Sequence, residues 1–304
     1  ADLGKLREFI DARGIQLVQT WHTRDHVLAW RALGWSPAKR RAALVRWYKT
    51  AEPIADRAHN RVLYGRGCDG LLCVSPRVAA QNAHLCRGPV RGVFGAVDTE
   101  AFRPAAKDPT VLRSLGLAPE HRVVGIVARG QRKRRFPLLL EAARRLFHRD
   151  PLARLLIIGR GTHRREVAEE PARELGIADR VIFAGYRVDD YIDVVRAIDV
   201  FTFLVPGSDG TCRALLEALS LGTPAVTTRR GALPEIIRDG ETGYTVDEEP
   251  DLLADRWHEL LSDESRRKAF GEAARRDAVS RFAIPRFADE VASFYEDVET
   301  FRRG

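Results

Sequence analysis

The 304-residue chain contains no methionine and only four cysteines. Cys68, Cys73, Cys86 and Cys212 show neither C-x-x-C spacing nor a histidine pattern suited to zinc, so we expect small buried thiols in a reducing compartment. No stretch approaches the roughly 18 uninterrupted apolar residues of a membrane span, and the first residues do not resemble a secretory signal. These absences argue against a disulfide scaffold and a membrane-spanning protein, and they predict a cytoplasmic location.

The charge balance leaves several kinds of partner open. The formal net charge is +8, which is compatible with phosphate-bearing ligands, anionic lipid and nucleic acid. Most arginines lie in amphipathic helical patterns opposite acids, as Arg144 and Arg145 do near Glu141, and indicate solvated helix faces. No helix-turn-helix, zinc-finger pattern or aromatic-interleaved basic strand occurs, so we expect no nucleic-acid partner.

Short apolar runs alternate with helical patterns along the chain. This alternation predicts parallel sheets covered by helices on both faces, and the length allows two domains. Ligands of such sheets bind beyond the carboxyl ends of the strands. The strands are expected at residues 15–20, 70–74, 90–94, 123–128, 155–158, 181–184, 200–203, 225–228 and 244–246.

The stretch 205–228 combines a turn-rich loop, a helix expected from about residue 211, and a strand. Two acids stand out in it, Asp209 before the helix and Glu217 within it. Helical spacing would separate them by about 10 Å along the axis, which suits two ends of one elongated polar ligand. Two carboxylates that act on a single bond lie only about 5–9.5 Å apart. The alternatives are that Asp209 caps the helix and that Glu217 is a solvated helix residue.

A strongly basic loop follows the strand at 123–128. Residues 129–136 carry five positive charges, on Arg129, Arg132, Lys133, Arg134 and Arg135. Guanidinium groups bind phosphate oxygens in bidentate fashion, so the loop predicts a clamp for a diphosphate. A solvated basic turn or a patch for lipid headgroups are the alternatives.

Several segments together resemble the family 4 retaining glycosyltransferases. Residues 205–228 look like the family's Glu-x7-Glu signature, with Asp209 in place of the first Glu. Residues 68–75 are similar to its "cDxiiaxS" strand, residues 93–104 to its "ixxGvDxxxFxP" segment, and residues 230–243 to its "GgxpEixxdGxtG" run. The resemblance implies an α/β protein with two Rossmann-like doubly wound domains facing a cleft, the GT-B architecture.

The resemblance also implies a domain division. Residues 1–104, joined by a C-terminal helix at 285–304, correspond to the acceptor-side domain, and residues 105–284 to the domain that binds the nucleotide sugar. The family's opening strand and glycine-rich loop have no counterpart here. We therefore expect the first domain to be truncated and the chain to be a fragment.

Roles for individual residues follow from the same resemblance. Glu217 would accept hydrogen bonds from ribose hydroxyls, and Asp209 would hold the transferred sugar or the diphosphate together with the backbone N–H groups of Gly210 and Thr211. Arg129 and Arg134 would stabilise the departing phosphates. Three further residues complete the implied donor side: Arg187, Val188 and Arg213.

The acceptor-side histidine of the family has no clear counterpart. His22 and His26, in and beside the loop after the first strand, are the candidates, and we place His22 among the catalytic residues. Either histidine would equally suit a hydrogen-bonded structural role.

The implied activity is retaining transfer of a hexose from a nucleoside-diphosphate sugar to an acceptor, by front-face displacement. A cell-envelope or lipid-linked glycan is the expected acceptor, with peripheral contact to an anionic inner membrane face. No Asp-x-Asp occurs, and arginines can supply the positive charge of a metal, so we expect no metal and no other cofactor. The alternatives are a non-catalytic or fragmentary nucleotide-sugar-binding protein and a nucleotide-sugar epimerase of the same fold.

Overall fold

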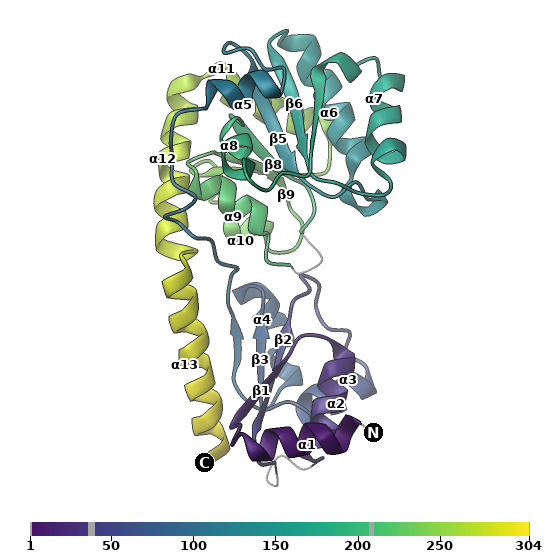
Figure 1. Ribbon diagram of the computed structural model, residues 1–304, viewed down its shortest axis with the longest axis vertical. Coiled ribbons are helices and arrows are strands. Elements are labelled where there is room, and N and C mark those ends of the chain that lie inside the picture. The colour runs from purple at the N-terminus through teal and green to yellow at the C-terminus, as the bar shows by residue number, and fades with distance from the viewer. Residues whose placement is uncertain (1, 36–39, 207–209, 304) are drawn as a thin grey trace. The chain divides into compact units, whose positions relative to one another are not determined.

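The computed structural model describes residues 2–35, 40–206 and 210–303, which form two compact units (Figure 1). The first unit comprises the described residues of Ala1–Gly95, Ser208–Thr211 and Pro285–Gly304. The second comprises those of Ala96–Gly207 and Cys212–Ile284. Each unit is an α/β structure with its own parallel sheet, so the predicted α/β class with parallel sheets is confirmed.

The first unit is built on a four-stranded parallel sheet in the order β1-β2-β3-β4. The last helix of the chain, α13, belongs to this unit. The strands are β1 (Leu17–Thr20), β2 (Ala43–Tyr48), β3 (Gly70–Cys73) and β4 (Val90–Gly92), and the helices are α1 (Asp2–Ala12), α2 (Thr23–Leu33), α3 (Ala58–Gly65), α4 (Pro76–Asn82) and α13 (Ile284–Arg303).

Alternate residues of the strands pack on opposite sides of this sheet, as the two-residue repeat of a strand requires. Leu44 and Leu71 face a core formed with α1 to α4, whereas Leu72 packs against Phe294 and Val298 of α13. A Cβ atom at Gly70 would lie 2.4 Å from the side chain of Val298. Glycine at this position therefore lets α13 approach the sheet closely.

Two helices of the first unit begin in different ways. Ser75 is the N-cap of α4, and its side chain accepts a hydrogen bond from the backbone N–H of Val78 at 3.3 Å, as expected for serine before proline. Asp25 is not the cap of α2, because that helix begins at Thr23 with His22 as its N-cap. Asp25 lies in the first turn and accepts a hydrogen bond from the backbone N–H of His22 at 3.2 Å.

The second unit contains a six-stranded parallel sheet in the order β10-β9-β8-β5-β6-β7. The chain direction across the sheet reverses between β5 and β8, which pair at Val124–Val200 and Gly125–Phe201. This is the topological switch point of a doubly wound sheet, where ligands bind outside the carboxyl ends of the strands. The strands are β5 (Arg122–Val127), β6 (Ala153–Ile158), β7 (Val181–Gly185), β8 (Val200–Phe203), β9 (Ala225–Thr228) and β10 (Gly243–Val246).

Helices cover both faces of the second sheet. On one face, α6 and α11 pack over a core that includes Phe136 and Trp257, both almost fully buried. On the other face, α9 packs on β8 and β9 and is covered in turn by α12. The helices of this unit are α5 (Pro109–Ser114), α6 (Phe136–Arg149), α7 (Glu170–Glu174), α8 (Tyr191–Arg196), α9 (Arg213–Ser220), α10 (Leu233–Ile236), α11 (Pro250–Ser262) and α12 (Glu264–Arg281).

The compact units divide at Gly95 and Ala96, earlier than the boundary expected after residue 104. Backbone contacts explain the difference. The N–H of Val97 donates to the carbonyl of Phe282 at 2.8 Å, and the guanidinium of Arg275 donates to the carbonyl of Phe102 at 3.1 Å. Residues 97–102 are therefore already bound to α12 and to Phe282, the residue after it, so they belong to the second unit.

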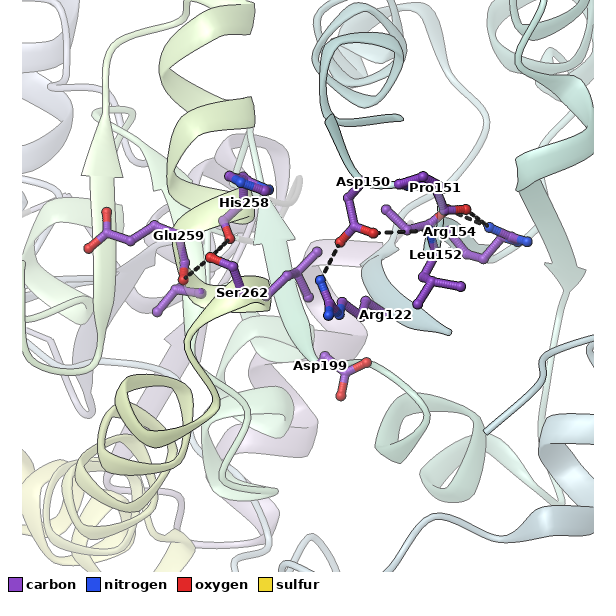
Figure 2. A network of polar contacts seen from close by, with 12 residues as sticks. Arg122, Asp150, Pro151, Leu152, Arg154, Asp199, His258, Glu259 and Ser262 are labelled. Atoms are coloured by element: carbon purple, nitrogen blue, oxygen red, sulfur yellow. Dashed lines mark hydrogen bonds and ion pairs between the residues drawn. The ribbon is translucent and has the colours of Figure 1, made fainter. Parts of the chain in front are cut away.

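Polar contacts at the amino ends of β5 and β6 are structural. Figure 2 shows Asp150, which is nearly fully buried. It accepts a hydrogen bond from the guanidinium of Arg122 at 3.0 Å and another from the backbone N–H of Leu152 at 2.9 Å. Arg154 donates to the carbonyl of Pro151 at 3.0 Å. These contacts fix the start of both strands, and they lie at the opposite end of the sheet from the carboxyl edge described next.

Candidate functional site

The loops at the carboxyl ends of β5 and β8 meet at the switch point. Arg134, in the loop after β5, donates from Nη1 to the carbonyl oxygens of Val205 at 3.4 Å and Pro206 at 3.3 Å. From the end of β9, the hydroxyl of Thr228 donates to the carbonyl of Leu204 at 2.5 Å. The exit segment 204–206 is therefore held from both sides by the neighbouring strands.

Glycines bring the loops after β5 and β6 into backbone contact. The N–H of Gly130 donates to the carbonyl of Arg160 at 3.3 Å, and a Cβ atom at Gly161 would lie 2.5 Å from the nitrogen of Gly130. Gly159 adopts φ +135°, a conformation that side chains rarely allow. Glycine at positions 130 and 161 therefore allows the two loops to approach this closely.

The five cations of the basic loop differ in their partners. Arg132 pairs with Glu166 at 2.8 Å, and Arg135 pairs with Glu248 through Nε at 2.8 Å. Arg134 is half-buried and contacts the backbone of the exit segment. Within the described ranges, Arg129 and Lys133 form no ion pair with an acid, and both are exposed. Both residues therefore offer positive charge to an anion at this edge.

Glu217 lies in the second turn of α9 and is almost completely buried, with 3% of its surface exposed. Its Oε2 accepts a hydrogen bond from the hydroxyl of Tyr191 at 2.6 Å, and its Oε1 accepts one from Nε of Arg213 at 2.8 Å. Burial and the neighbouring Glu217 carboxylate raise the pKa of Tyr191, so the phenol stays protonated and donates. The alternative that Glu217 is a solvated helix residue is wrong, because its side chain is buried and joins α9 to the start of α8.

The loop after β7, which leads to Tyr191, presents exposed side chains. Arg187 is held by the carbonyl of Ala184 at 2.9 Å and by Asp190 at 2.8 Å, whereas Val188 is 67% exposed. The ring of Tyr186 is also largely exposed, and the guanidinium of Arg160 lies over it, 4.4 Å from its centroid. The loops after β6 and β7 thereby form one continuous edge.

Asp209 lies outside the described residues. Gly210 has φ +64°, and Thr211 precedes Cys212, the N-cap of α9, whose φ is +52°. The helix begins at Arg213 rather than near Thr211. The expectation that the N–H groups of Gly210 and Thr211 belong to the helix start is therefore wrong, because the left-handed Cys212 stands between them and the first turn.

In the first unit, the structure separates the two histidine candidates. His26 is fully buried, and its Nδ1 lies 2.8 Å from the hydroxyl of Thr20. Burial first, and then the charge of Arg46, lower the pKa of His26 to about 4. These properties fit a neutral structural histidine. His22 is exposed at the N-cap of α2, where its side chain is open to solvent.

An aromatic and cationic cluster lies beside His22, at the carboxyl ends of β1 and β2. The ammonium of Lys49 lies 3.9 Å from the ring centroid of Trp21 and 5.6 Å from that of Trp47. Trp21 is 50% exposed, and Trp47 stacks on Phe287 of α13. This edge of the first sheet offers an exposed aromatic face together with a positive charge.

Sequence reasoning missed two residues of the second unit, Tyr191 and Glu248. Tyr191 follows β7 and Glu248 follows β10, so the rule that polar residues after parallel strands meet at one edge could have found both. Their partners could not be read from spacing, since Tyr191 reaches 26 residues to Glu217 and Glu248 reaches 113 residues to Arg135.

The described part of the chain has neither a cluster of side chains that could hold a metal ion nor a helix that could span a membrane. Among residues 2–35, 40–206 and 210–303, no group of three or more histidine, cysteine, aspartate or glutamate side chains is arranged to hold a metal ion. In the same ranges, no helix has the length and apolar character needed to cross a membrane. All four cysteines are free and buried.

Comparison with known proteins identifies the family of the chain. The family model described as glycosyl transferases group 1 matches residues 108–277. D-inositol 3-phosphate glycosyltransferase of Corynebacterium urealyticum is 33% identical over 229 residues, 72% of this chain and 53% of that protein. N-acetyl-alpha-D-glucosaminyl L-malate synthase of Bacillus anthracis is 31% identical over 147 residues, 48% of this chain and 38% of that protein. The chain spans about half the length of the first of these curated relatives.

Solved structures share the fold at low identity. HepE of Anabaena in complex with UDP and glucose has a TM-score of 0.80 and 18% identity, covering 97% of this chain and 80% of that one. A glycosyltransferase of Rickettsia africae has a TM-score of 0.83 and 16% identity, with coverage of 97% and 80%. These likenesses establish a GT-B-type fold of Rossmann-like units, and the family model establishes the family. The chain belongs to the group 1 glycosyl transferases.

Proposed function

We propose that this protein transfers a hexose from a nucleoside-diphosphate sugar to an acceptor hydroxyl, with retention of anomeric configuration and without a metal ion. The family and the fold support this proposal, and the arrangement of charges at the switch point of the second unit carries it. The relatives span longer chains, so the activity of the full-length relatives is a hypothesis for this one.

The diphosphate is proposed to bind at the loop after β5. Two of its five cations are neutralised by Glu166 and Glu248, whereas Arg129 and Lys133 have no acid partner in the described residues. A doubly wound sheet places ligands at this point, and guanidinium groups stabilise the charge that develops on a leaving diphosphate. Arg134 would act beside Arg129, from the wall formed with Val205 and Pro206.

The nucleoside is proposed to lie along the loops after β6 and β7. Glu217 has two carboxylate oxygens with about four acceptor positions, and Tyr191 and Arg213 occupy one on each oxygen. The remaining positions are proposed to accept the ribose hydroxyls, with Arg187 and Val188 beside the base. Asp209, Gly210 and Thr211 remain proposed contacts of the transferred sugar or the diphosphate.

The acceptor is proposed to bind at the carboxyl edge of the first sheet, near His22. The exposed ring of Trp21 offers a flat apolar face to the C–H groups of a sugar, and Lys49 offers a donor and a positive charge. This combination favours a carbohydrate acceptor that carries an anionic group. A cell-envelope or lipid-linked glycan reached by a cytoplasmic protein at an anionic membrane surface would have this chemistry.

The names of the relatives are consistent with this proposal. One is an inositol phosphate glycosyltransferase and another makes a glucosaminyl malate, so each name includes an acceptor with an anionic group. HepE was solved with UDP and with UDP-glucose. The base and the sugar used by this chain are open to test.

A binding screen followed by a turnover assay tests the proposal. The full 304-residue chain is titrated calorimetrically with UDP-, GDP- and ADP-glucose, and the donor that binds is then followed for release or transfer of sugar. We expect binding of at least one donor and slow sugar release to water. If a donor binds but its sugar is neither released to water nor transferred to any acceptor tested, the protein binds nucleotide sugars without acting on them. Absence of binding to all three, and to their N-acetylglucosamine counterparts, would refute the assignment.

A further inference from the structure

The carboxylate of Glu248, directly after β10, bridges two loops that flank the proposed donor site. It accepts hydrogen bonds from Arg135, through Nε at 2.8 Å and through Nη2, and from Nε of Arg230. Arg135 ends the basic loop after β5, and Arg230 follows β9. In the sheet, β8 lies between β5 and β9. The bridge therefore spans the carboxyl end of β8, from which the exit segment 204–206 leaves.

The bridge acts on the same segment that Arg134 contacts. Arg134 directly precedes Arg135 and donates to the carbonyl oxygens of Val205 and Pro206, while Thr228 holds Leu204 from the β9 side. Because Arg135 and Arg230 bind the same carboxylate, the loops after β5 and β9 are held in place on either side of the exit segment. Without this anchor, the turn that carries Arg134 loses the ion pair between its neighbour Arg135 and Glu248.

The conformation of Arg135 makes such an anchor necessary. Its φ is +61° and it is the N-cap of α6, a left-handed conformation that costs free energy for any residue with a Cβ atom. Its side chain also belongs to a run of like charges that repel one another. An acid partner lowers this repulsion and keeps the guanidinium directed at Glu248 rather than at an incoming phosphate.

The exposure of the three side chains indicates how much the bridge contributes to stability. The side chain of Glu248 is 20% exposed, but those of Arg135 and Arg230 are 47% and 45% exposed. Ion pairs of exposed arginines contribute little to folding free energy. The bridge can therefore fix the conformation of the loop after β5 while adding little to the stability of the second unit.

We propose that Glu248 is a positioning residue for the donor diphosphate. It acts through Arg135, which holds the basic loop so that Arg129 and Arg134 meet the phosphates, and it does not touch the donor itself. This inference rests on the proposed function. It adds a residue to which neither the sequence motifs nor the family match assigns a role.

The test compares four proteins in calorimetric titrations with UDP, GDP and ADP: wild type, Glu248→Gln, Arg135→Gln and the double variant. The substitutions remove the same contact from its two sides. We expect each single variant to weaken binding of the preferred nucleoside diphosphate by about tenfold, and the double variant to be no weaker than either single one. Such non-additivity is the signature of one shared interaction.

The matched control is Asp255→Asn. Asp255 of α11 pairs with Arg149 at the other end of α6, so this variant also removes an acid that holds an arginine at an end of the same helix. It should bind the diphosphate as wild type does, and all variants should unfold within about 2 °C of wild type because the pairs are exposed.

Three results decide between explanations. If Glu248→Gln binds as well as wild type or more tightly while Arg135→Gln binds weakly, Arg135 contacts phosphate directly and the positioning role is wrong. If Asp255→Asn weakens binding equally, the effect is a general one of helix α6 and the inference also fails. If wild type binds none of the three diphosphates, the proposed function fails before the role of Glu248 is reached.

Discussion

Replacement of Tyr191 by phenylalanine tests the buried carboxylate on which the proposed donor site depends. The change keeps the ring that packs edge to face against Phe102, at 6.2 Å between centroids, and removes only the hydroxyl that donates to Glu217 at 2.6 Å. Glu217 is 3% exposed, so solvent screens the hydrogen bond from Tyr191 only weakly. A buried anion would lose one of its two hydrogen-bond partners.

The expected cost follows from the charge of the acceptor. A hydrogen bond to a charged group contributes about 1.5–3 kcal/mol, and a buried acceptor left without its donor loses the whole amount. Arg213 still pairs with the second oxygen, but its side chain is 75% exposed and offers little further compensation. We therefore expect Tyr191→Phe to lower the free energy of unfolding by about 2 kcal/mol, which is a decrease in melting temperature of about 4–8 °C for a unit of this size.

Scanning calorimetry of the second unit's transition measures this change. Tyr186→Phe is the matched control, because its ring is largely exposed and surface substitutions alter stability by less than about 0.5 kcal/mol. A double-mutant cycle with Glu217→Gln completes the experiment: once the carboxylate is gone, Tyr191→Phe should cost less than it does alone. The reasoning is refuted if Tyr191→Phe melts with wild type.

The pH dependence gives an independent check. The folded-state pKa of Tyr191 is raised, first by burial and then by the charge of Glu217, so the protonated phenol is favoured in the folded protein. Its contribution is complete below the unfolded-state pKa of about 10 and is lost as the pH rises above that value. The difference in melting temperature between wild type and Tyr191→Phe should therefore shrink between pH 9 and pH 11 (roughly the titration range of an unperturbed tyrosine).

Four further outcomes are expected. Glu217→Ala should weaken donor binding by about 1–3 kcal/mol if its hydrogen bonds to ribose are lost; unchanged affinity in calorimetric titration would remove it from the site. Arg134→Ala should reduce donor turnover by far more than Arg132→Ala, because Arg132 is already paired with Glu166; equal losses of turnover and stability in Arg134→Ala would mean a structural role. Chelation with EDTA should leave sugar transfer unchanged, and abolished transfer would contradict the metal-free mechanism. The pKa of His26 is lowered from 6.5 to about 4, so the unfolded chain binds the extra proton first and acidification from pH 6.5 to 4 should cost about 3 kcal/mol of stability; a His26→Gln variant with the same acid slope would contradict this.

The sequence predicted the strands of the second unit well because they are covered on both faces. The run at 155–158 in β6 is apolar throughout, and β8 is interrupted only by Thr202. Short runs of this composition leave little choice of structure. The start of α9 could not be predicted in the same way. Cys212 adopts a left-handed conformation that cysteine rarely takes, and no local signal marks it.

The histidines of the first unit show a different limit. His22 and His26 are four residues apart and chemically identical, and the sequence offered both as acceptor-side candidates. Their environments separate them: His26 faces Thr20 in the core, and His22 caps α2 at the surface. Burial is a property of the packed unit, and a residue's type and spacing do not contain it.

The basic loop shows most clearly why a site is more than its motif. Five cations in eight positions are equivalent in the sequence, and a diphosphate needs only some of them. The folded chain supplies acids from 34 residues away for Arg132 and 113 residues away for Arg135, and it turns Arg134 toward the backbone of the exit segment. Selective neutralisation lowers the repulsion within the loop while leaving charge at Arg129 and Lys133. If this is how the loop is prepared for its ligand, the acids are as much a part of anion binding as the arginines, and they should be sought among residues that follow other strands of the same sheet.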